Sequence, residues 1–245
     1  MSQLNSSLGK WQEASPELVY LLQKAEEFHK RTEGHFDICQ KELLEEIGYG
    51  PKNNAGAGKQ AKHTRSSHEP RFLVDPKNNR ILIHRQIEFG GFGKGFALDQ
   101  VASILDSAGV SHYCINAGGD IFARQGKGEQ PWQILLEHPD DPSMAVGTVK
   151  IDGVALAASA ANRRKWGSGM HHLINAKTGK PSEGVNGIFL IAKTGIEADA
   201  YATALFTAGF EKGIELSSRL PVQMLLVSSE NKMYKTDGFK AELYG

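Results

Sequence analysis

The chain has 245 residues, enough for one large domain or two small ones, and 40% of them are hydrophobic. Its 28 basic and 28 acidic residues balance, so no overall field attracts nucleic acid or an anionic membrane. The two cysteines, Cys39 and Cys114, exclude a disulfide framework and a cysteine-built zinc site.

The N-terminal residues bear on location. No apolar run approaches the roughly 18 residues that a membrane helix needs, so no transmembrane segment is expected. Residues Met1–Trp11 contain neither an apolar signal core nor a lipid-attachment cysteine. As the chain stands, we expect a cytoplasmic protein; a true N-terminus further upstream would make the periplasm the expectation.

The first predicted element is a helix that begins after Ser15, with Pro16 at its first position, and ends at Gly34. The apolar pattern is then lost over residues 51–71, where basic residues stand among Gly, Asn and Ser. This segment has no interleaved aromatic residues that could stack on bases, so we predict a mobile surface loop rather than a nucleic-acid contact.

The rest of the chain alternates strand and helix patterns. A hairpin, Phe72–Val74 with Ile81–Ile83, precedes a glycine-rich segment and a helix that Gly109 ends. Further strands and helices follow, and because the strands cluster with helices inserted among them, we predict an α+β fold in a single domain, 1–245. The later strands are expected at 113–115, 133–137, 146–151, 154–157, 172–174, 188–192, 223–228 and 232–236, and the later helices at 196–207 and 211–219.

Gly90–Gly95 is the richest segment chemically. It lies between a predicted strand and a helix start, where backbone N–H groups and the helix dipole favour a phosphate. A Walker A loop needs Ser or Thr after its lysine, but Gly95 follows Lys94, and the glycine spacing does not fit the Rossmann fingerprint. Spacing alone leaves open an unusual phosphate loop or a plain tight turn.

Three other features are weaker by themselves. Asn116–Asp120 is a second glycine turn, either capped locally by its polar residues or facing a ligand. Asp199 and Thr203 are four residues apart on a predicted helix, so both oxygens face the same side and could hold Mg²⁺. His172, next to His171, is either structural or a general base.

Six segments, in order, resemble the FAD:protein FMN transferases, the ApbE-type flavin transferases, over nearly the whole chain. The most specific is Gly90–Asp99, similar to Gly-Gly-Ile-Ala-Lys-Gly-Tyr-Ala-x-Asp, and Ile115–Asp120 matches the family motif residue for residue. The others are Ser2–Asn5, Thr32–Asp37, His171–Gly179 and Glu197–Leu205.

The resemblance implies a T-fold-like, largely antiparallel α+β architecture and an activity. Family members bind FAD and Mg²⁺, cleave the diphosphate, transfer FMN to a Thr or Ser hydroxyl of a partner redox protein and release AMP. It implies His172 and Asp199 as catalytic residues and Gly93, Asp199 and Thr203 as metal ligands. The cofactor-binding residues implied are Asn5, Gly90, Gly91, Lys94, Gly95, Asp99, Gly118, Gly119, Asp120, His172 and Thr178.

The sequence also departs from the family pattern. Ala157–Ala160 reads Ala-Ala-Ser-Ala where the family carries Ala-Thr-Ser-Gly, and Asn175-Ala176 replaces Asp-Pro. Family members also have tens of residues before the segment that Ser2–Asn5 resembles. Two alternatives to transfer therefore stay open: a relative that binds or hydrolyses FAD to FMN and AMP, and a non-catalytic assembly module on the same fold.

Overall fold

The computed structural model describes residues 2–46, 70–160, 165–166, 170–171 and 173–244, whose contacts separate into two compact units. The first unit comprises residues 1–89 and 174–180, and the second comprises residues 90–173 and 181–245. Residues 51–69 of the expected loop and His172 lie outside the described residues. The single domain expected over 1–245 stays a prediction, because compact units of this kind can belong to one domain or to two.

The first unit is built on helix α2 (Pro16–Arg31), whose start follows the predicted cap. Ser15 accepts a hydrogen bond from the Leu18 N–H, and Pro16 occupies the first turn. The helix buries one apolar face, and Phe28 on that face meets Phe36 edge-on, with ring centroids 5.7 Å apart. The other elements are α1 (Ser2–Asn5), β1 (Trp11–Glu13), α3 (Lys41–Glu46), β2 (Phe72–Asp75), β3 (Arg80–Ile83) and β11 (Ile174–Asn175).

One prediction for this unit is confirmed and one is corrected. The hairpin of β2 and β3 forms as expected, and β1 adds antiparallel to β3, giving the order β1-β3-β2. Arg71, in the predicted loop, is instead anchored by ion pairs to Glu26 and Asp37. The prediction that the loop extends to residue 71 is therefore wrong.

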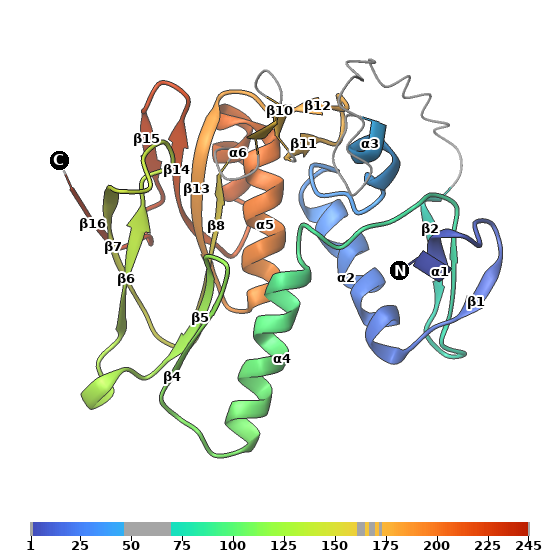
Figure 1. The fold of residues 1–245 in the computed structure, drawn as a ribbon, viewed down its shortest axis with the longest axis horizontal. Coiled ribbons are helices and arrows are strands. Elements are labelled where there is room, and N and C mark those ends of the chain that lie inside the picture. The colour runs from blue at the N-terminus through green and yellow to red at the C-terminus, as the bar shows by residue number, and fades with distance from the viewer. Residues whose placement is uncertain (1, 47–69, 161–164, 167–169, 172, 245) are drawn as a thin grey trace. The chain divides into compact units, whose positions relative to one another are not determined.

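The second unit contains a six-stranded antiparallel sheet in the order β15-β14-β13-β8-β5-β4. Figure 1 shows helices on one side of this sheet and the three-stranded sheet β16-β7-β6 on the other. An apolar core between the two sheets includes Leu136, Ile151, Leu156 and Phe189. The sheet elements are β4 (Tyr113–Ala117), β5 (Asp120–Arg124), β6 (Trp132–Glu137), β7 (Ala145–Ile151), β8 (Val154–Ala160), β13 (Val185–Ala192), β14 (Gln223–Ser228), β15 (Met233–Lys235) and β16 (Ala241–Leu243).

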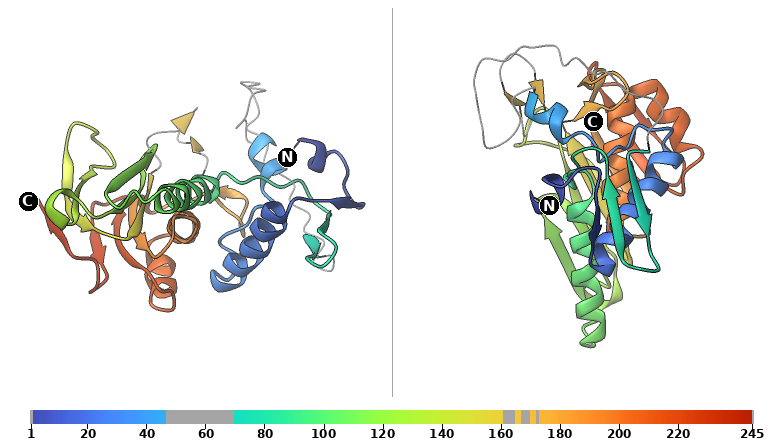
Figure 2. Two further views of the ribbon diagram at one scale, coloured as in Figure 1. Left: turned by 90° about the horizontal axis from the view of Figure 1, so that it is seen from below. Right: turned by 90° about the vertical axis from the view of Figure 1, so that its right-hand side faces the viewer.

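Helices α4 (Gly93–Ser107) and α5 (Gly195–Ala208) both contact the six-stranded sheet, and they meet where each begins, with α4 below α5 in Figure 1 and in the right view of Figure 2. Helix α5 is buried on nearly all sides, since it packs on α4, on α6 (Phe210–Ser217) and on strands β8 and β13. The remaining short elements are η1 (Lys127–Glu129), β9 (Lys165–Trp166), β10 (Met170–His171) and β12 (Lys180–Pro181).

The predicted α+β class with largely antiparallel sheets is confirmed. The strand expected at 172–174 is replaced by β10, which ends at His171, and β11, which begins at Ile174. No helix in the described part of the chain is long and apolar enough to cross a membrane.

Candidate functional site

A cluster of three charged side chains joins α4, β5 and α5 in the second unit. The Nζ atom of Lys94 lies 2.6 Å from Oδ2 of Asp120 and 3.1 and 3.2 Å from the two carboxylate oxygens of Asp199. Both aspartates are buried, with 2% and 3% of their surface exposed, whereas the Lys94 side chain is 41% exposed. One ammonium group thus faces two buried carboxylates, and the cluster carries one uncompensated negative charge.

Backbone donors fix both carboxylates. Oδ2 of Asp199 accepts a hydrogen bond of 3.0 Å from the Gly95 N–H, in the first turn of α4. Oδ1 of Asp120 accepts one of 3.1 Å from the Ala158 N–H on β8. Since a buried carboxylate is costly without such partners, these bonds hold the two acidic groups in place rather than leaving them to relax.

The close crossing of α4 and α5 depends on two glycines. A Cβ atom on Gly95 would lie 2.1 Å from the Gly195 carbonyl oxygen, and one on Gly195 would lie 2.4 Å from that of Gly95. No larger residue fits at either position without separating the helices. This contact brings the start of α4, with Lys94, against the turn of α5 that carries Asp199.

The electrostatics of the cluster favour a cation. Burial, and next the neighbouring Asp120 carboxylate, raise the pKa of Asp199 to about 6, although Lys94 opposes the shift. Burial by itself lowers the pKa of Lys94, but Asp199 and Asp120 outweigh it, so the pKa is raised overall. Of the two causes that raise the pKa of Asp199, the repulsion from Asp120 is the one that a further positive charge would offset.

Oxygen donors for a metal ion gather beside this cluster. Thr203 lies one helical turn after Asp199, and its hydroxyl donates a hydrogen bond of 3.3 Å to the Gly91 carbonyl. The carbonyl that meets Thr203 is therefore that of Gly91, two residues before the predicted ligand Gly93, which begins α4. Carboxylate, hydroxyl and carbonyl oxygens form a donor set suited to Mg²⁺. No group of three or more His, Cys, Asp or Glu residues able to hold a metal occurs among the residues described.

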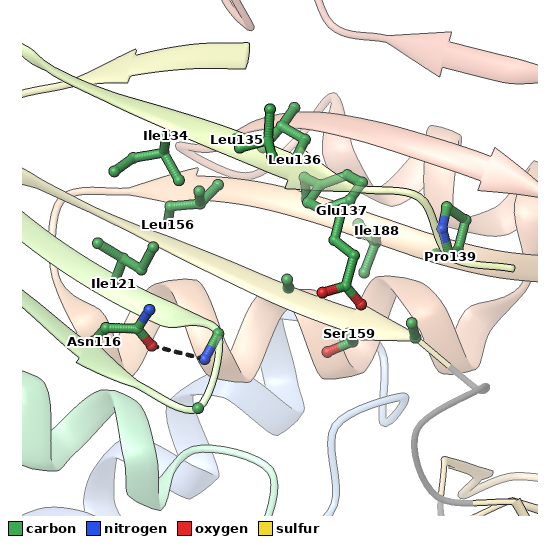
Figure 3. Close-up of a pocket in the computed structure, with 16 residues that line it drawn as sticks. Asn116, Ile121, Ile134, Leu135, Leu136, Glu137, Pro139, Leu156, Ser159 and Ile188 are labelled. Carbon is green, nitrogen blue, oxygen red and sulfur yellow. Dashed lines mark hydrogen bonds between the residues drawn. The ribbon is translucent and has the colours of Figure 1, made fainter. Parts of the chain in front are cut away.

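A pocket of about 390 Å³ adjoins the cluster within the same unit. Figure 3 shows it between β6 and the larger sheet, with apolar walls from Ile121, Ile134 and Leu156, and with Glu137 and Ser159 facing each other. Gly118 and Gly119, just before Asp120, also line it, as does Ala158. The Ala158–Asp120 hydrogen bond thus links the pocket wall directly to the charged cluster.

The second glycine turn, between β4 and β5, needs its glycines for their backbone. Gly118 and Gly119 have φ values of +69° and +106°, which few other residues adopt, and a Cβ on either would meet nothing within 4 Å. The Asn116 side chain accepts a hydrogen bond of 2.9 Å from the Gly119 N–H, which supports the predicted local cap (Figure 3).

Other predicted site residues have contacts that hold the fold. The carboxylate of Asp99 accepts hydrogen bonds from Gly195 and Ile196 at 2.6 and 2.9 Å and so caps α5. In the first unit, the Asn5 amide bonds both backbone groups of Ile87, and the Thr178 hydroxyl accepts from the Lys180 N–H. Cofactor contacts by these three residues stay predictions, as does one by Gly90.

The structure thus brings together six of the predicted site residues: Gly91, Lys94, Gly95, Asp120, Asp199 and Thr203. The predicted catalytic role of His172 stays a prediction, because this residue lies outside the described part of the chain. Sequence reasoning missed Gly195 and the Ala158 N–H. The first is a lone glycine at a helix start and the second a backbone group, so neither gave a residue-type signal; only their hydrogen bonds and close contacts reveal them.

The family model described as "ApbE family" matches residues 1–226. The chain belongs to the ApbE family. The FAD:protein FMN transferase of Escherichia coli K12 is 27% identical over 226 residues, covering 84% of this chain and 63% of that protein. The protein of the same name from Rhodobacter capsulatus is also 27% identical, over 99% of this chain and 49% of its own length. This chain therefore spans about half to two thirds of these relatives.

Solved structures agree with this placement. The ApbE protein of Thermotoga maritima superposes with a TM-score of 0.88 at 26% identity, covering 96% of this chain and 81% of that one. The flavin transferase ApbE of Vibrio cholerae gives a TM-score of 0.83 at 22% identity, covering 97% and 81%. The ApbE-type fold predicted from the sequence motifs is confirmed.

Proposed function

We propose that this ApbE-family chain transfers FMN from FAD to a Thr or Ser hydroxyl of a redox protein, releases AMP and requires Mg²⁺. The observation that carries the proposal is the buried pair Asp120 and Asp199, held by a single lysine beside the Thr203–Gly91 oxygen donors. The names of the relatives, FAD:protein FMN transferase, supply the substrate class.

The residues fit a divalent cation. Asp199 and Thr203, with a carbonyl of the glycine segment, would hold Mg²⁺, and the remaining positions would go to phosphate oxygens and water. When bound, the ion neutralises charge on the diphosphate as the P–O–P bond breaks. The negative charge left over on the Asp120–Asp199 pair is the physical reason why this donor set attracts such an ion.

The chain's own groups would place the rest of the substrate. The Lys94 side chain is partly exposed, so its ammonium group can also contact a phosphate oxygen that approaches the cluster. The apolar pocket beside Gly118 and Gly119 has the size and lining to bury one of the two ring systems of FAD. The acceptor hydroxyl forms the new P–O bond, AMP leaves with the electron pair, and the hydroxyl proton passes to a base, for which His172 is the candidate.

The activity is tested by incubating the purified chain with FAD, Mg²⁺ and a protein that the Escherichia coli relative flavinylates, with that relative as positive control. Flavin that remains on the acceptor after denaturation supports transfer. Free FMN and AMP without protein-bound flavin would show a hydrolase, and intact FAD would show a binding or structural role.

The cation site is tested by Asp199→Ala. Loss of the carboxylate should abolish Mg²⁺-dependent FAD cleavage, whereas Thr203→Ala should be milder because water can replace a neutral ligand. Asp106→Ala is the matched control. Asp106 pairs with Arg124 and lies 12 residues after Lys94 on α4, roughly 18 Å along the helix. An unchanged magnesium titration in a folded Asp199→Ala protein would remove this site from the proposed function.

A further inference from the structure

The Lys94 ammonium group lies where a cation would have to approach Asp199. It is 3.1 Å from Oδ1 and 3.2 Å from Oδ2 of that carboxylate, so it covers both oxygens at once. Oδ2 also accepts the Gly95 N–H bond, which leaves Oδ1 as the better placed oxygen for a further ligand. A metal ligated by Asp199 and the lysine contact to the same carboxylate therefore compete.

The competition is electrostatic as well as steric. Mg²⁺ binds oxygen at about 2.0–2.1 Å, so an ion on Asp199 would lie close to Nζ of an undisplaced Lys94. Two positive charges at such a separation repel strongly in a buried site. For a metal to bind, the ammonium group must leave Asp199.

The Lys94 side chain can move away from Asp199. Its side chain is 41% exposed and has a flexible four-carbon stem, whereas both aspartates are fixed by backbone N–H groups. Its 2.6 Å contact with Asp120 can keep the ammonium group at the site while it turns away from Asp199. A diphosphate at the start of α4 would provide a second anion for the displaced group.

We propose that Lys94 blocks the Asp199 cation site until a diphosphate draws its ammonium group away, so that the metal and the diphosphate bind cooperatively. The inference rests on the cation site of the proposed function and adds a positioning role for Lys94. The free chain then binds divalent cations weakly, and the diphosphate of the substrate raises that affinity. By linkage, the metal raises the affinity for the diphosphate by the same factor.

The test measures Mn²⁺ binding by electron paramagnetic resonance, with and without ADP, corrected for Mn²⁺–ADP complexes in solution. ADP supplies a diphosphate but no flavin, so no turnover occurs. In the parent chain, ADP should tighten Mn²⁺ binding about 10-fold or more. Lys94→Met should bind Mn²⁺ without ADP about 10-fold more tightly than the parent, and ADP should add little further.

Two variants control for charge and for folding. Lys94→Arg keeps the positive charge and should bind Mn²⁺ as weakly as the parent. Lys212→Met removes a lysine that pairs with Glu215 on α6 and should change nothing. Thermal unfolding of each variant identifies any protein that has lost its fold, and if Lys94→Met fails to fold, Lys94→Gln takes its place.

The outcomes separate the two proposals. If Asp199→Asn abolishes Mn²⁺ binding but Lys94→Met does not tighten it, the blocking role of Lys94 is wrong and the cation site stands. If Asp199→Asn binds Mn²⁺ like the parent, or if the parent binds none even with ADP, the cation site is wrong and the role of Lys94 falls with it.

Discussion

The two glycine-rich segments of the second unit use the same residue for different physical reasons. In Gly90–Gly95, Gly95 has ordinary helical backbone, and the absence of its side chain lets the Gly195 carbonyl approach closely. In the β4–β5 turn, Gly118 and Gly119 have open space around a would-be Cβ, and only their positive φ values require glycine.

The difference shows what each segment contributes to the site. The first fixes how two helices cross, and with that the position of Lys94 relative to Asp199. The second turns the chain so that Asp120 enters β5 pointing to the cluster, while the turn itself lines the pocket. Substitutions in the first should therefore damage the fold, and those in the second should mainly affect the local turn.

The largest effect is expected from Gly95→Ala. Its methyl group would overlap the Gly195 carbonyl, and moving the helices apart would break the Gly95–Asp199 hydrogen bond, so we expect a loss of about 3 kcal/mol or more in unfolding free energy. Urea denaturation followed by circular dichroism measures it. Gln100→Ala, on the exposed side of α4, is the matched control, and a Gly95→Ala protein as stable as the parent would contradict the close helix contact.

A smaller loss, about 1–2 kcal/mol, is expected for Asp99→Ala. The substitution removes the acceptor for two backbone N–H groups at the start of α5 while leaving the glycine pair intact. Asp99→Asn should retain part of the cap. Urea denaturation measures this loss of unfolding free energy. A loss in FAD affinity without a loss in stability would instead support the predicted cofactor contact of Asp99.

Gly119→Ala should cost about 1 kcal/mol, because alanine disfavours the φ of +106° although its methyl group would meet no neighbour. Thermal unfolding monitored by calorimetry gives the size of this penalty. A loss as large as that of Gly95→Ala would show that the turn, too, is limited by packing and would remove the distinction between the segments.

Gly118→Asn should have the smallest effect, below about 0.5 kcal/mol, since asparagine tolerates φ near +69° better than other side chains. Gly118→Val is the contrasting variant, because a β-branched residue is strained there. Calorimetry on the pair tests whether backbone conformation alone sets the requirement at this position; equal losses would contradict it.

Local patterns predicted most of the regular structure. The cap at Ser15, the β2–β3 hairpin and helix α4 all depend on residues close together in sequence, and the structure confirms them. Strand β5 is not among the predicted strands, because the glycine pattern places Asp120 at the end of a turn, whereas Asp120 is the first residue of the strand. Three-residue strands such as β1 are too short to show a period.

The sequence predicts which residues form the candidate site, but it does not predict how they are arranged in space. Lys94, Asp120 and Asp199 were singled out from three separate motifs, and only the fold brings them into contact, because they are far apart in the chain. The Gly95–Gly195 crossing joins positions 100 residues apart, a distance over which periodicity carries no information. Motif order indicated the family, and tertiary packing supplied the geometry.

Helix α5 is enclosed by α4, α6 and the large sheet, and this has a consequence for hydrogen exchange. Amide protons on an element with so little solvent contact exchange mainly when the unit opens as a whole, and so rank among the slowest. Asp199 and Thr203 therefore sit on a scaffold that is static on the timescale of local fluctuations. Of the three charged side chains at the cluster, the partly exposed Lys94 is the one that can change rotamer without the unit opening.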